Sequence, residues 1–184
     1  RNASREEYEP SYSRPMSQGT RCHQLAMYVV YNQPLAMLCD SPTAYEAEPE
    51  FTKFLAEIPT TWDSWSAIDG EIGEYIVVRG EKDGYLYYAG LNGNTSREVT
   101  IHFGTFGYSP DNDHYGDIEI YSDKGDSSTD YDYTHIETNG TRYVIGDNFP
   151  SELKIDMSPG GGFVLKTHIR TWEDMKKTRL KQRD

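Results

Sequence analysis

The sequence has few cysteines, few basic residues and no long apolar run, and each shortage excludes a class of function. Its two cysteines, Cys22 and Cys39, form no CxxC pair and no metal-ligand spacing, so a zinc or redox site has little support. A disulfide between them stays open. The longest apolar stretch, near Ala26 to Tyr31, is far shorter than the roughly 18 residues that predict a membrane-spanning helix.

The shortage of positive charge bears on possible partners. The chain has 18 basic and 30 acidic residues and a formal net charge of -12. Such a surface repels phosphate backbones, which argues against nucleic acid as a partner but leaves neutral ligands such as sugars unaffected. The chain opens on Arg1, not on Met, and shows no signal peptide, so we expect a piece of a longer or processed protein.

Tyrosine is the most prominent residue type that is present. Aromatic residues make up 13% of the chain and 15 of them are tyrosines. This composition argues against disorder and favours a strand-rich fold.

The first third of the chain alternates helical and strand patterns. After a polar loop over residues 1–19, the apolar spacing predicts a helix over residues 20–32, with Thr20 as its N-cap. The short apolar run Leu35 to Cys39 is typical of a strand buried on both faces of a parallel sheet. A second helix follows over residues 49–58, with one apolar face. Helix, buried strand and helix together predict part of an α/β crossover unit.

From residue 60 onward the pattern changes to short strands separated by turns. The alternation and the turn residues predict an antiparallel β-sandwich. The predicted strands cover residues 73–80, 85–91, 97–103, 117–121, 131–136, 142–145, 153–157 and 163–169.

Several runs of sequence resemble one family of enzymes. They are Met16 to Tyr31 (MSQGTRCHQLAMYVVY), Pro34 to Pro42 (PLAMLCDSP), Phe54 to Thr60, Asp69 to Tyr75 (DGEIGEY) and Ser158 to Phe163 (SPGGGF). In these runs the chain resembles glycoside hydrolase family 97, bacterial exo-acting α-glucosidases and α-galactosidases. The resemblance spans most of residues 1–166.

The resemblance implies a parent protein with an N-terminal β-super-sandwich, a catalytic (β/α)₈ barrel and a C-terminal β-sandwich. Residues 1–59 would form the end of the barrel as loop, helix, strand and helix, residues 60–170 the C-terminal β-sandwich, and residues 171–184 a charged tail. The expected fold class is therefore mainly β, an antiparallel sandwich preceded by the last helix–strand–helix of the barrel. The resemblance also implies a periplasmic or exported location in a bacterium.

The chemistry of the family would lie outside this chain. Glycoside hydrolysis needs two carboxylates flanking the scissile bond, and the resemblance places these glutamates and the calcium ligands upstream. We therefore predict no catalytic residue, metal ligand or cofactor here, and no activity of this chain alone. The chain would brace the barrel of an enzyme that hydrolyses terminal α-linked sugars of an oligosaccharide substrate.

Three residues are candidates for substrate binding in the intact enzyme. Asp40 follows the predicted barrel strand, at the end where barrel enzymes build their sites, although a turn-capping role explains it as well. Tyr8 and Tyr12 lie in the loop before the first helix and could stack on a sugar. In the same loop, the carboxylates of Glu6, Glu7 and Glu9 read as a solvated acidic stretch.

Two alternatives stay open. The chain could be a stand-alone carbohydrate-binding module, which would need a row of exposed aromatic residues on one face of the sandwich. Tyr85, Tyr87 and Tyr121 could supply such a row. It could also be a purely structural β-sandwich without a ligand.

Overall fold

The computed structural model describes residues 2–3, 8–13, 16–38, 40–103, 118–125, 130–136 and 152–168. The helices are α1 (Arg21–Val30), α2 (Pro42–Glu46) and α3 (Pro49–Glu57). The strands are β1 (Asn2–Ala3), β2 (Ser17–Gln18), β3 (Ser64–Glu71), β4 (Tyr75–Lys82), β5 (Tyr85–Asn92), β6 (Arg97–His102), β7 (Ile118–Asp123), β8 (Tyr131–Ile136), β9 (Glu152–Met157) and β10 (Gly162–His168).

Both predicted helices are confirmed. The Thr20 hydroxyl caps α1 by accepting a hydrogen bond from the backbone N–H of His23 at 3.0 Å. Helix α3 begins at Pro49, which needs no N–H partner there, and it buries Phe54 and Leu55. The short helix α2 was not predicted; it is capped by Ser41.

The predicted strand at Leu35 to Cys39 does not form. Residues 35–38 are coil, and Leu35, Met37 and Leu38 are 74%, 72% and 56% exposed. Cys39 lies outside the described residues. A strand buried on both faces needs a hydrogen-bonding neighbour, and the described part of the chain places none beside this segment. An apolar run alone therefore did not suffice to make a strand.

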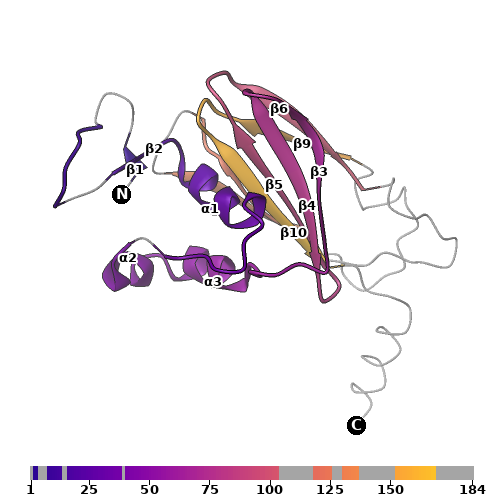
Figure 1. Cartoon of the computed structure of the whole chain (residues 1–184), viewed down its shortest axis with the longest axis horizontal. Coiled ribbons are helices and arrows are strands. Elements are labelled where there is room, and N and C mark those ends of the chain that lie inside the picture. The colour runs from indigo at the N-terminus through magenta and orange to yellow at the C-terminus, as the bar shows by residue number, and fades with distance from the viewer. Residues whose placement is uncertain are drawn as a thin grey trace, which may run out of the picture.

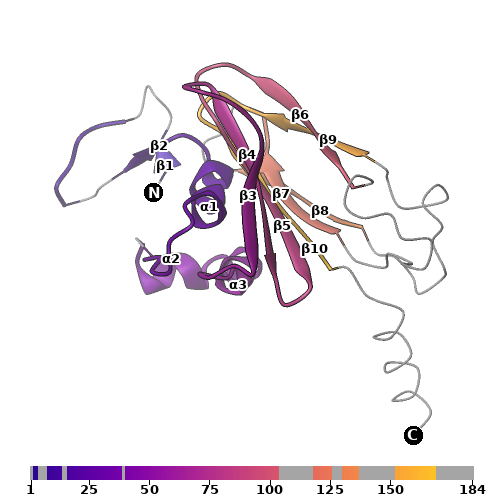
Figure 2. The ribbon, with the colours of Figure 1, turned by 45° about the vertical axis from the view of Figure 1, so that its right-hand side comes forward.

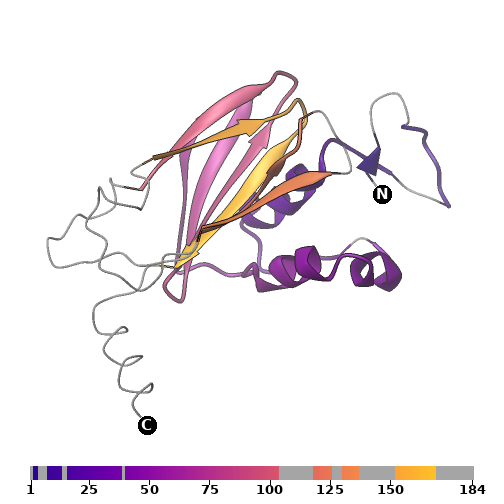
Figure 3. The same cartoon turned by 180° about the vertical axis from the view of Figure 1, so that it is seen from behind.

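The centre of the structure is an antiparallel six-stranded sheet in the order β3-β4-β5-β10-β7-β8. Figure 1 shows this sheet with α1 and α3 on one side, and the turned view of Figure 2 shows the same arrangement. The two-stranded sheet β6–β9 covers the opposite face, as seen from behind in Figure 3. The predicted mainly antiparallel β-sandwich is confirmed.

Most of the described strands agree with the sequence prediction, although the two-residue strands β1 and β2 lie in the segment predicted as a loop. The hairpin β4–β5 turns at Asp83 and Gly84, both with positive φ, as the turn residues predicted. Strand β3 was missed, and it pairs with β4 at the edge of the sheet. The predicted strand at residues 142–145 lies outside the described residues.

Alternating side chains of the central strands form two separate cores. On β5, Tyr87 and Ala89 point to the helices, whereas Leu86 and Tyr88 point to the β6–β9 pair. The helix-side core joins the sheet to residues of α1 and α3, among them Cys22, Leu25, Ala26, Val29, Phe54 and Leu55. The helices and the sheet therefore fold as one packed body, in which Cys22 is a free, buried thiol. The domain boundaries at residues 59/60 and 170/171 stay predictions.

Candidate functional site

The predicted site residue Asp40 lies at the surface, in a turn. Its carboxylate accepts a hydrogen bond from the backbone N–H of Ser41 at 2.8 Å, and its own N–H donates to the hydroxyl of Tyr45 at 3.1 Å. These contacts are those of a turn cap that leads into α2. Asp40 also lines an open cavity, so a role toward substrate in a larger enzyme stays a prediction.

The structure does not bring the other two predicted residues to that cavity. Tyr8 is 39% exposed and Tyr12 is fully exposed, and neither lines the cavity that Asp40 lines. Glu9 is exposed, while Glu6 and Glu7 lie outside the described residues. The stacking role of the two tyrosines stays a prediction.

The cavity has a volume of about 270 Å³ and opens between α1, the coil that follows it, and the pair α2 and α3. Its walls are largely apolar, and the residues that line it include Leu25, Met27, Tyr28, Ala36, Met37, Tyr45, Phe51 and Leu55. Ala36 and Met37 of the exposed coil over residues 35–38 thus form part of the cavity wall.

The acidic residue Glu48 in the cavity wall is engaged on both oxygens. Its Oε1 is 2.6 Å from Nη1 of Arg21, and its Oε2 accepts from the Tyr131 hydroxyl at 3.1 Å. The Arg21 guanidinium also stacks over the rings of Phe51 and Tyr131, at 5.1 and 5.4 Å from their centroids. This cluster ties the helices to β8, and it offers no pair of free carboxylates for hydrolysis.

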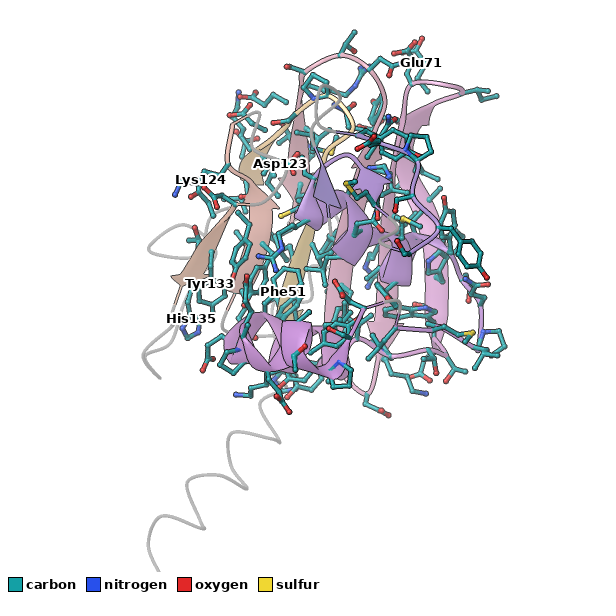
Figure 4. The ribbon with its side chains drawn as sticks, turned by 90° about the vertical axis from the view of Figure 1, so that its left-hand side faces the viewer. Phe51, Glu71, Asp123, Lys124, Tyr133 and His135 are labelled. Carbon is teal, nitrogen blue, oxygen red and sulfur yellow. The ribbon has the colours of Figure 1, made fainter. Side chains whose placement is uncertain are left out.

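A buried polar junction lies at the start of α1. Asp123, at the end of β7, is 8% exposed, and its Oδ2 accepts from the backbone N–H groups of Ser158 and Gly162 at 2.9 and 2.8 Å. The side chain of Thr20 hydrogen-bonds to the same carboxyl group. We call Asp123, Thr20 and the turn over residues 158–162 the Asp123 junction; Figure 4 shows Asp123 on the sheet beside α1.

Burial dominates the electrostatics of the Asp123 carboxyl. Desolvation raises its pKa above the usual value, and the hydrogen bonds from Thr20, Ser158 and Gly162 oppose that rise. Its Oδ1 is buried without a hydrogen-bond partner among the described residues. Sequence reasoning did not predict this junction, although the three consecutive glycines of the SPGGGF run signal a close backbone approach.

The aromatic row needed for a carbohydrate-binding face does not form. Tyr87 and Tyr121 are buried in the helix-side core, and of the three predicted tyrosines Tyr85 alone is exposed. Trp62 packs edge-on against Tyr87, and the indole N–H of Trp65 donates to the carbonyl of Val29 at 3.0 Å. Both tryptophans anchor the helices to the sheet, which disfavours a stand-alone sugar-binding sandwich.

The described residues contain no cluster of three or more His, Cys, Asp or Glu side chains that could hold a metal ion. No helix in the described ranges is long and apolar enough to cross a membrane.

Comparison with known proteins identifies a family and a relative that match this chain. The family described as "Glycosyl-hydrolase 97 C-terminal, oligomerisation" matches residues 61–168. A retaining alpha-galactosidase of Bacteroides thetaiotaomicron is 41% identical over 171 residues, which cover 90% of this chain and 23% of that protein. The chain thus spans about a quarter of its relative.

Solved structures share the fold. A glycoside hydrolase family 97 enzyme of Pseudoalteromonas sp. strain K8, in complex with panose, matches with a TM-score of 0.66 and 24% identity, over 83% of this chain and 23% of that one. A beta-arabinopyranosidase matches with a TM-score of 0.61 and 21% identity, over 80% of this chain and 21% of that one. The chain belongs to the glycoside hydrolase 97 C-terminal family, as its sequence motifs indicated.

Proposed function

We propose that this chain is the C-terminal part of an exo-acting α-glycosidase, of the galactosidase or glucosidase type, that hydrolyses terminal α-linked sugars. Within it, the chain braces the catalytic barrel and carries no catalytic residue. The relative named retaining alpha-galactosidase supports the activity, because its similarity extends over nearly the whole of this chain.

The observation that carries the bracing role is the shared core of helices and sheet. Residues of α1 and α3 pack with Val78, Tyr87, Ala89, Tyr121 and Val164 of the sheet. The two helices lie outside the family-matched residues 61–168, yet they cannot separate from the sheet without opening this core. Any barrel that includes α1 and α3 is therefore fixed to the sandwich.

The coil between the two helices marks the side on which the barrel would lie. Leu35, Met37 and Leu38 face solvent here, and full burial of one such side chain contributes about 1.5–3 kcal/mol. A neighbouring parallel strand would pair with this segment and bury all three residues. We propose that residues 35–39 become the closing strand of the barrel in the intact enzyme.

The remaining features of the parent follow from the same proposal. Its substrate would be an oligosaccharide, and its paired carboxylates and calcium ligands would come from residues upstream of Arg1. The contribution of this chain to the active site would be substrate binding by Asp40, Tyr8 and Tyr12, without a catalytic role. A periplasmic or exported location is part of the proposal.

An activity assay tests the proposal directly. The chain alone should not hydrolyse p-nitrophenyl α-galactoside or α-glucoside, whereas the parent protein with its upstream sequence should hydrolyse at least one of them. Turnover by the isolated chain would contradict the absence of catalytic residues, and an inactive, folded parent would contradict the glycosidase assignment.

A pair of variants tests the closing strand. Leu35→Asp should destabilise the parent by several kcal/mol, because it places a charge in a strand buried on both faces, but it should leave the isolated chain unchanged. The control Ile72→Asp alters a fully exposed residue in the β3–β4 turn and should be neutral in both proteins. Urea unfolding of the four variant proteins and the two wild types measures the difference, and a neutral Leu35→Asp in the parent would refute the strand.

A further inference from the structure

The Asp123 junction also holds the segment that enters α1. The backbone N–H of Thr20 donates to the carbonyl of Gly160 at 3.1 Å, and Nδ1 of His23 lies 3.0 Å from the carbonyl oxygen of Gly161. Gly19 has a φ of +92°, and a Cβ atom on it would lie 2.5 Å from the Gly160 carbonyl oxygen. The two segments therefore touch backbone to backbone.

The carboxylate of Asp123 organises the turn on the other side of this contact. It gathers the N–H groups of Ser158 and Gly162 on one oxygen, which gives the turn over residues 158–162 a fixed shape. A Cβ atom on Gly161 would overlap this carboxylate. The backbone of the turn therefore packs directly against the carboxylate and leaves no room for a side chain at residue 161. Its negative charge lies by the start of α1, where the exposed N–H groups of a helix favour an anion.

The start of α1 is also the end of the loop that carries Tyr8 and Tyr12. Strand β2, the stem of this loop, pairs in parallel with β1 and ends at Gln18, next to Gly19. In a (β/α)₈ barrel each helix begins near the carboxyl end of the preceding strand, and active sites are built from the loops on that face. If α1 is a barrel helix, the junction lies at the level of that face.

We propose that Asp123 is a positioning residue of the parent enzyme, through which the C-terminal sandwich fixes the loop before α1 on the catalytic face. This inference rests on the proposed function. Asp123 touches no substrate; it sets the turn over residues 158–162, the turn holds Gly19 and Thr20, and these hold the loop stem.

The experiment compares the parent enzyme with its Asp123→Ala and Asp123→Asn variants. Asp156→Asn is the control, because Asp156 is an exposed carboxylate on β9. The measurements are kcat and KM on p-nitrophenyl α-galactoside or α-glucoside, together with hydrogen exchange of the amides at residues 16–20 and in β4 and β5.

Asp123→Ala should speed exchange at residues 16–20 by about tenfold or more, while β4 and β5 stay protected. It should raise KM by about tenfold with a smaller change in kcat, since displaced positioning loops cost substrate orientation. Asp123→Asn keeps an acceptor for the two N–H groups and should recover most of both effects. The control should match the wild type.

Two results would overturn the inference: exchange that rises equally across the sheet, which indicates general destabilisation, or an unchanged KM despite faster exchange at residues 16–20. A wild-type parent without activity on either sugar would refute the proposed function instead. In that case the exchange rates alone decide whether Asp123 holds the loop stem.

Discussion

Alanine variants of Gly19 and Gly73 can be compared to measure how closely the end of the loop stem contacts the turn over residues 158–162. Both have positive φ, +92° and +84°, so alanine strains the backbone at either position. A Cβ atom at Gly19 would meet the Gly160 carbonyl, whereas nothing lies within 4 Å of one at Gly73.

We therefore expect Gly19→Ala to lower the free energy of unfolding clearly more than Gly73→Ala, whose cost should be about 1–2 kcal/mol of backbone strain. Thermal unfolding of both variants of this chain measures the difference. Equal shifts in Tm would mean that the contact between Gly19 and Gly160 is loose.

The buried carboxyl of Asp123 predicts how stability depends on pH. Because its folded-state pKa lies above the usual value of 3.8, the folded protein binds a proton more readily than the unfolded chain does. The unfavourable contribution of the charged form is thus absent at low pH and sets in as pH rises through the folded pKa. His23 and Cys22 are the titratable neighbours that share its surroundings.

The stability of the wild type relative to Asp123→Asn should accordingly fall as pH rises from about 4 through the raised folded-state pKa of Asp123. Urea unfolding at several pH values measures this difference, and the comparison with the variant cancels most other titrating groups. A difference that grows in favour of the wild type with pH would contradict the raised pKa.

The residue-level prediction from sequence was weakest where partners are far apart in the chain. Asp123 ends a strand and its partner turn begins 35 residues later, so no local pattern indicates their contact. Asp40, in contrast, lies in the turn that its local sequence Asp-Ser-Pro indicated. Local hydrogen bonding can be inferred from spacing, whereas a long-range junction depends on the register of the sheet.

At the scale of elements, the docking of α3 depends on a hydrogen bond from the sheet. The Tyr87 hydroxyl donates to the carbonyl of Glu57, the last residue of α3, at 2.9 Å. Tyr85, on the same strand, is exposed, and its ring packs at a tilt against that of His168.

Tyr87→Phe should destabilise the chain by about 1 kcal/mol, because the partly buried carbonyl at the end of α3 loses its donor. Tyr85→Phe is the matched control and should stay within about 0.5 kcal/mol of the wild type. Urea unfolding tests both; a control as destabilised as Tyr87→Phe would show that the hydroxyl does not secure the helix.

The elements also show where periodicity suffices and where it fails. Helices α1 and α3 were predicted because capping and spacing are local. Strand β3 was missed because Ser64–Glu71 is largely exposed and lacks an apolar alternation; pairing with β4 makes it a strand. The run at residues 35–38 is the opposite case, a strand that was predicted but does not form. Its composition is that of a buried strand, but no described strand pairs with it.

At the scale of the whole molecule, the six-stranded sheet separates two cores that differ in origin. The core on the β6–β9 side is built within the family-matched residues 61–168, whereas the helix-side core needs α1 and α3 from residues before them. Removing the helices would uncover one apolar face of the sheet.

A chain that begins at Thr60 should therefore bind a hydrophobic dye and scatter light more strongly than the full chain, although it keeps every family-matched residue. Dye fluorescence and light scattering at equal concentration measure the effect. A monodisperse, dye-negative chain from Thr60 would show that the sheet face needs no cover.

The shared helix-side core has a practical consequence for anyone who exchanges such C-terminal pieces between related enzymes. A splice at the border of the matched residues would separate the helices from the strands they pack against, and the hybrid would inherit mismatched halves. A splice ahead of Ser17 transfers both halves together, and it keeps the loop stem and its contact with the turn over residues 158–162.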